Sequence, residues 1–140
     1  MRRAIVKAET ISQAQFHDID PMNIVWHGNY PRFFELGRVE LLDKIEYNYD
    51  EMARSGYGWP VIEMNIRYAH PMLLRQKVVI IAGLTEWENR LKIDFEIRNM
   101  ETKQRLCKAY TTHVAVDLKT NEMQWETPKV FRDKLEPFRA

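Results

Sequence analysis

The chain has 140 residues, 45% of them hydrophobic and 29% charged, which is typical of a folded globular protein and predicts one domain over residues 1–140. Its 21 lysines and arginines nearly balance 20 aspartates and glutamates, and a net charge of +1 argues against nucleic acid as a partner, because binding that polyanion needs a basic excess. The longest apolar run, residues 78–82, is too short to span a membrane, and the single cysteine, Cys107, excludes an internal disulfide and favours a reducing, cytoplasmic location.

The first half of the chain predicts a strand, a polar loop and one long helix. Residues 3–16 alternate loosely between apolar and polar side chains, as a strand does, and the polar residues 17–23 follow as a loop. Over residues 30–45, apolar side chains recur at spacings of three and four and form one stripe of a helix, with Asn29 as its expected N-cap. Gly37 lies on this stripe, which predicts that the helix approaches a sheet closely.

The second half predicts mainly strands. After a glycine-rich turn, four runs with strand character are spaced as in a meander: residues 60–70, 77–87, 91–97 and 104–117. One face of the last run carries small side chains, which suits the close packing of the helix around Gly37: Cys107, Ala109, Thr111 and Ala115. Thr127 and Pro128 are expected to open a short C-terminal helix, with Thr127 as its cap. One long helix on a five-stranded, mostly antiparallel sheet is an α+β architecture.

The densest polar group, His17, Asp18, Asp20 and His27, lies in the loop before the helix. A carboxylate there can attack a carbonyl carbon or activate water, while N–H groups at the helix N-terminus stabilise negative charge on an oxygen. The two aspartates also suit the simpler role of turn formers. His17 and Asp18 resemble a metal-binding pair, but two adjacent residues with no partner motif are weak support, and no metal site is expected.

The loop and the helix start resemble the active-site segment of the 4-hydroxybenzoyl-CoA thioesterase family, which includes YbgC-like acyl-CoA thioesterases. The matching segment is Asp18-Ile19-Asp20-Pro21-Met22-Asn23-Ile24-Val25-Trp26-His27-Gly28-Asn29-Tyr30, followed by Glu35 and Arg38. Residues 108–117 and Thr127-Pro128 are similar to the family's last strand and closing helix. The resemblance implies a hotdog fold, in which a curved antiparallel sheet wraps a long central helix. It also implies hydrolysis of an acyl-CoA thioester to a carboxylic acid and free CoA, without a cofactor.

The same resemblance implies roles for individual residues. Asp20 matches the catalytic carboxylate, acting as nucleophile or as general base. His27 matches the residue whose backbone N–H polarises the thioester carbonyl, and its side chain is expected to assist catalysis. Asp18 is expected to support the loop, and Asn23 replaces the family's glycine, where asparagine tolerates a left-handed backbone and alters the mouth of the site. Three further residues of the segment are expected at the substrate: Val25, Trp26 and Tyr30.

Binding of CoA phosphates calls for cations, and Arg90 and Lys92 are the candidates, with ordinary exposed edge charges as the alternative. Cys107 is expected to pack in the core rather than act as a nucleophile. Since a single sheet leaves an edge exposed, and family members pair their sheets, we expect a homodimer or homotetramer with active sites at the subunit interface. Two other functions stay open: an acyl-carrier-protein thioesterase, and a non-catalytic protein that binds acyl-CoA.

Overall fold

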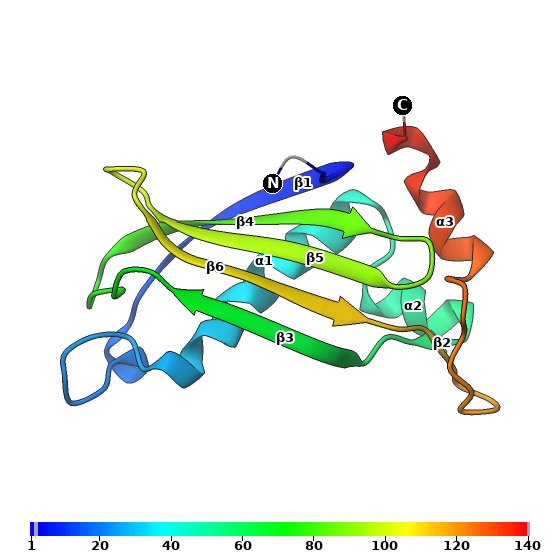
Figure 1. Cartoon of the computed structure of the whole chain (residues 1–140), viewed down its shortest axis with the longest axis horizontal. Coiled ribbons are helices and arrows are strands. Elements are labelled where there is room, and N and C mark those ends of the chain that lie inside the picture. Colours follow the sequence, from blue (N-terminus) through cyan, green and yellow to red (C-terminus); the bar gives the residue numbers. More distant parts are fainter. Residues whose placement is uncertain (2, 140) are drawn as a thin grey trace.

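In the computed structural model, which describes residue 1 and residues 3–139, one long helix lies across one face of a curved five-stranded antiparallel sheet (Figure 1). The strands are β1 Val6–Gln13, β3 Val61–Tyr68, β4 Lys77–Glu86, β5 Leu91–Asn99 and β6 Arg105–His113. The helix is α1, Tyr30–Lys44. The predicted α+β hotdog architecture is confirmed.

The strand order is β1-β4-β5-β6-β3, so β1 and β3 form the two edges of the sheet. Only β4, β5 and β6 follow one another as a meander, and the predicted meander of all four later strands is wrong for β3. A meander needs short turns, whereas residues 69–76 are long enough to carry the chain past two strands, each about 4.8 Å wide. Among the residues that the structure places, β3 therefore pairs with β6 alone, and its other edge is open.

α1 packs chiefly over β1 and β4, and Gly37 lies at the closest approach. A Cβ at Gly37 would lie 2.8 Å from Cγ2 of Ile80 and 3.4 Å from Cβ of Ala82, both on β4. The predicted close approach is confirmed. The predicted partner is wrong, because the small residues of β6 lie farther across the sheet than the strands that α1 covers.

A second helix, α2 Tyr49–Ser55, was not predicted. The side chain of Asn48 caps it by accepting the N–H of Tyr49, and Gly56 ends it with a left-handed φ of 89°. The predicted strand 104–117 is divided, because β6 ends at His113 and β7, Val116–Asp117, pairs with β2, Tyr57–Gly58.

The C-terminal helix α3, Lys129–Leu135, begins one residue later than predicted, since Pro128 is its N-cap. Thr127 does not cap it. Its Oγ1 instead donates to the carbonyl oxygens of Trp87 and Glu88, at 2.5 and 3.0 Å, and ties this segment to the β4–β5 turn. The described part of the chain also contains three short 3₁₀ turns: η1 Phe16–Asp18, η2 His27–Asn29 and η3 Glu136–Phe138. Among the described residues, no helix combines the length and the apolar character that crossing a membrane requires.

Candidate active site

Asp18 holds together the loop between β1 and α1. Its carboxylate is 1% exposed and accepts the N–H of Gln15 at 2.8 Å. Nη2 of Arg32 donates to both carboxylate oxygens, at 2.7 Å to Oδ1 and 2.6 Å to Oδ2. Its backbone carbonyl accepts the N–H of Trp26 at 2.9 Å and the side-chain amide of Asn29 at 3.0 Å. Asp18 therefore supports the loop, as predicted, and Asn29 is committed to it rather than capping α1.

The charge state of Asp18 follows from these contacts. Burial raises its pKa, but the hydrogen bond from Gln15 and the Arg32 guanidinium outweigh burial and hold the pKa of this carboxyl below its usual value. The carboxylate is therefore charged at neutral pH, which its bidentate contact with Arg32 requires.

Asp20 stands at a tight turn within the same loop. Its N–H donates to the carbonyl of Ile24 at 2.8 Å, and its carbonyl accepts the N–H of Asn23 at 2.9 Å. One carboxylate oxygen, Oδ1, accepts the N–H of Met22 at 2.8 Å. Asn23 has a φ of 69°, which confirms the predicted left-handed backbone. The turn fixes the Asp20 carboxylate and commits one of its oxygens to the loop.

A pocket of about 360 Å³ opens beside Asp20. Its walls come from the loop, from the first residue of α1, and from the last residue of β3 with the segment that follows it: Asp20, Met22, Ile24, Val25, His27, Tyr30, Tyr68, Ala69, His70 and Pro71. The structure thus brings together four of the residues predicted at the site: Asp20, Val25, His27 and Tyr30. Most of the wall is apolar, so the pocket suits an acyl group with a carboxylate and an imidazole at its side.

Among the described residues, two consecutive ones after the loop carry free backbone donors, and the first of them, His27, lines the pocket. Within the described chain, the N–H groups of His27 and Gly28 have no hydrogen-bond acceptor, whereas that of Asn29 donates to the Trp26 carbonyl at 2.9 Å. They precede α1, whose N-terminus carries a partial positive charge. This is an arrangement that can stabilise negative charge developing on a bound carbonyl oxygen.

Two predicted substrate residues, Asn23 and Trp26, do not line the pocket. Asn23 is exposed at the turn. The indole ring of Trp26 lies over Gly28, so closely that a Cβ on Gly28 would collide with it. Within a single chain, neither side chain therefore reaches the pocket: that of Asn23 is exposed at the turn, and that of Trp26 lies at the start of the helix. Their contact with the substrate stays a prediction.

Arg90 and Lys92 lie at the other end of the sheet. Tyr68, at the pocket, is in register with Cys107 and Ile97, whereas Leu91 is in register with Val61 through His113. From Ile97 to Leu91 the strand covers about 20 Å. A single chain therefore does not bring Arg90 and Lys92 to Asp20.

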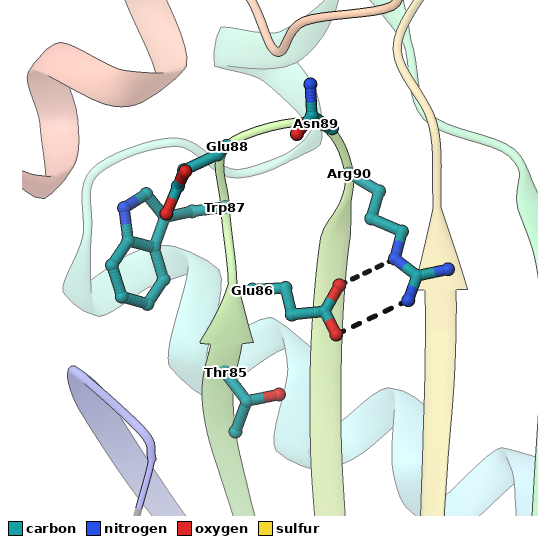
Figure 2. A pocket seen from close by; sticks show the side chains of 6 residues that line it. All are labelled: Thr85, Glu86, Trp87, Glu88, Asn89 and Arg90. Carbon is teal, nitrogen blue, oxygen red and sulfur yellow. Dashed lines mark hydrogen bonds and ion pairs between the residues drawn. The ribbon is translucent and has the colours of Figure 1, made fainter.

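Both cations have local partners. Arg90 Nε donates to Glu86 Oε2 at 2.6 Å, within a hollow of about 400 Å³ over the β4–β5 turn (Figure 2). Figure 2 shows the guanidinium facing both carboxylate oxygens of Glu86. Lys92 Nζ lies 4.5 Å from the centre of the Tyr110 ring on the outer sheet face.

The end of β3 contributes pocket residues that the sequence did not indicate, Tyr68 above all. Its hydroxyl donates to the His27 carbonyl at 2.7 Å, and its ring meets that of Tyr30 edge-on at 4.7 Å. Tyr68 and His27 are 41 residues apart, and no spacing pattern in the sequence connects them. The sequence indicated only that a strand ends near His70 and Pro71. Beneath Tyr68, burial raises the pKa of Cys107 to about 12, which suits the predicted core residue and not a nucleophile.

Glu35 and Arg38, which continue the family segment, lie one and two turns along α1 from the pocket. Arg38 Nη2 donates to Glu35 Oε2 at 2.7 Å, and its Nε donates to the Tyr49 hydroxyl at 2.8 Å. Arg38 also faces the ring of His113, which is buried. This cluster joins α1 to α2 and β6.

Comparison with known proteins agrees with the geometry. A family model described as "Thioesterase-like superfamily" matches residues 14–138. "Putative esterase sll0410" of Synechocystis sp. is 29% identical over 128 residues, which are 91% of this chain and 77% of that protein. "Putative acyl-CoA thioesterase YneP" of Bacillus subtilis is 26% identical over 106 residues, 75% of this chain and 76% of that protein. A solved DHNA-CoA thioesterase from Staphylococcus aureus superposes with a TM-score of 0.77 at 24% identity, covering 84% of this chain and 78% of that one.

Proposed function

Because the chain belongs to the thioesterase-like superfamily, we propose that it hydrolyses an acyl-CoA thioester to a carboxylic acid and free CoA. One observation carries the proposal: the Asp20 carboxylate and His27, whose N–H has no acceptor in the described chain, line one largely apolar pocket at the start of α1. Two similar proteins bear the names of an acyl-CoA thioesterase and a DHNA-CoA thioesterase, which supports the same substrate class.

In the proposed reaction the thioester carbonyl oxygen accepts the His27 N–H, and the α1 dipole stabilises the charge that develops there. The Asp20 oxygen that Met22 does not occupy then acts in one of two ways. As a nucleophile it attacks the carbonyl carbon, CoA leaves as a thiolate, and water hydrolyses the resulting anhydride. As a general base it takes a proton from a water that attacks the same carbon.

The side chains around Asp20 have supporting roles in this proposal. The His27 imidazole lines the pocket and is exposed, so it can pass a proton to the departing thiolate. Val25 and Tyr30 are buried and give the acyl group a fixed apolar wall.

We also propose that the working form is at least a homodimer joined along β3. β3 has an open edge, and the inward-facing side chains of Met64 and Tyr68 are 39% and 46% exposed. A second β3 added about a two-fold axis runs antiparallel to the first. The partner's β3 then sets its Val61 end beside this chain's Tyr68, which closes the pocket.

The same arrangement gives Arg90 and Lys92 a role. In each chain these cations lie at the Val61 end of the sheet. Two-fold pairing therefore brings those of one copy toward the pocket of the other, where the phosphates of CoA would extend. Their proposed contact with CoA is thus made across the interface, and it depends on the dimer.

The test is a thiol-release assay over a panel of acyl-CoAs, with Asp20→Asn as the variant. Asparagine keeps the acceptor for the Met22 N–H, so the turn survives while the nucleophile or base is lost. We expect kcat to fall at least about 100-fold. Asp50→Asn is the matched control, because Asp50 is exposed on α2, and its activity should equal that of the wild type.

Three outcomes separate the alternatives. Unchanged activity of Asp20→Asn removes Asp20 from the mechanism. Turnover of acyl groups only on an acyl carrier protein changes the substrate class, and binding of acyl-CoA without hydrolysis across the panel makes the protein a binding module. Single turnover in ¹⁸O-labelled water then decides the role of Asp20. The general-base route puts one ¹⁸O into every product molecule, whereas a first product with no ¹⁸O requires the nucleophilic route, in which the acid takes its second oxygen from Asp20 and water attacks the Asp20 carbon of the anhydride.

A further inference from the structure

Tyr68 fastens the catalytic loop to the edge of the sheet. It is the last residue of β3, and its hydroxyl donates to the carbonyl oxygen of His27 at 2.7 Å. The loop is tied to the following segment at two further points, because the Val25 N–H donates to the Met72 carbonyl at 2.8 Å and Ile24 forms a bridge with Leu73. Of these three ties, that of Tyr68 is the one made to the carbonyl of His27.

The hydrogen bond from Tyr68 is made to the peptide group between His27 and Gly28. The carbonyl of His27 and the N–H of Gly28 belong to the same planar group. A donor at the carbonyl polarises this group, which makes its N–H a stronger donor, and also fixes the direction of that N–H. Gly28 N–H is one of the two groups here that have no acceptor in the described chain.

The hydroxyl is well held for this task. The Tyr68 ring meets Tyr30 edge-on at 4.7 Å and His27 edge-on at 6.4 Å, and Tyr30 is buried. Burial raises the pKa of Tyr68 above its ordinary value, so the phenol stays protonated, and able to donate, across the neutral range.

We propose that Tyr68 is a positioning residue of the thioesterase site, which orients and polarises the His27–Gly28 peptide so that Gly28 N–H joins His27 N–H in stabilising the developing oxyanion. The inference rests on the proposed function. It assigns to the end of β3 a part in the chemistry, in addition to its part in the pocket wall. It also gives a role to the hydrogen bond from the Tyr68 hydroxyl to the His27 backbone carbonyl, which joins two residues 41 positions apart.

The deciding variant is Tyr68→Phe, which keeps the ring against Tyr30 and removes the donor. We expect kcat for a good acyl-CoA substrate to fall about three- to tenfold while KM stays within about twofold, because the oxyanion forms only in the transition state. Tyr57→Phe is the control: Tyr57 lies on β2, away from the pocket, and its loss of a hydroxyl should leave both constants unchanged.

A second measurement does not depend on activity. The chain has five glycines, so ¹⁵N-glycine labelling gives a short amide spectrum in which the Gly28 signal can be followed. Tyr68→Phe should shift the Gly28 amide resonance and leave that of Gly83, on β4, in place. A purely structural tie would instead lower thermal stability and alter kcat and KM together.

The outcomes distinguish the two proposals. Turnover by the wild type with an unchanged kcat in Tyr68→Phe, or an unmoved Gly28 resonance, overturns the role of Tyr68 and leaves the thioesterase proposal standing. Absence of turnover by the wild type over the whole panel overturns both.

Discussion

At the scale of single residues, the loop depends on one buried charge. Asp18 is enclosed by the Gln15 N–H and the Arg32 guanidinium, and nothing else in the loop satisfies that guanidinium. Asp18→Asn keeps an acceptor for Gln15 but removes the charge. We expect the free energy of unfolding to fall by about 1–3 kcal/mol in urea titrations at pH 7. Asp50→Asn, an exposed change, should cost less than about 0.5 kcal/mol.

The pH dependence of this difference tests its cause. Since the folded-state pKa of Asp18 is lowered, its stabilisation is complete above the unfolded-state value and is lost as pH falls through the folded-state value. The gap between wild type and Asp18→Asn should therefore narrow below about pH 4. A gap that stays constant down to pH 2 would show that Asp18 acts through packing and not through charge.

Residues of the loop were predictable because their roles are local. Asn23 has a left-handed φ of 69° in a tight turn, which asparagine tolerates better than most residues, so its own identity in this turn already favoured that backbone. Tyr68 was not predictable, because its role arises from a contact that exists only once β3 has paired with β6. Asn29 shows the same limit: a residue suited to cap a helix was recruited by the Asp18 carbonyl instead.

At the scale of elements, Gly37 sets the distance between α1 and β4. Gly37→Val should lower the free energy of unfolding by about 2–3 kcal/mol, because the new side chain meets the Cγ2 methyl group of Ile80. A β-branched side chain such as that of Ile80 has little freedom to rotate away. Helix propensity does not explain such a loss, since valine is a better helix former than glycine. Glu40→Val, on the exposed face of α1, is the control. Equal losses in both variants, measured by urea unfolding, would contradict this account.

The elements themselves were mostly evident from periodicity, and their pairing was not. The alternating run in β5 and the apolar stripe of α1 are properties of short segments. The place of β3 beside β6 depends on a connection long enough to pass two strands, and strand character alone does not reveal it. The wrong predicted position of β3 matters for function, because β3 lies at the edge of the sheet and its last residue, Tyr68, lines the same pocket as Asp20.

At the scale of the whole molecule, the open edge of β3 connects assembly with activity. The pocket is walled on one side by residues that end β3, and Met64 lies on the same face of that strand, 39% exposed. We expect Met64→Lys to place a charge within the proposed interface and to weaken self-association at least about tenfold in sedimentation. The fold should persist, since the side chain has room in the monomer.

The control for this change is Glu63→Lys, which places a lysine on the neighbouring residue, whose side chain points to the other face of β3. It changes the charge of the chain by two units rather than one and is therefore the more severe change in charge. If the active site is complete only in the dimer, kcat/KM of Met64→Lys should rise with protein concentration and approach the wild-type value once the dimer forms. Glu63→Lys should show no such dependence on concentration. A wild type that sediments as a monomer at concentrations where it is fully active would refute the shared site. It would also leave Arg90 and Lys92 at the end of the sheet away from Tyr68 and its pocket, with no route to the substrate's phosphates.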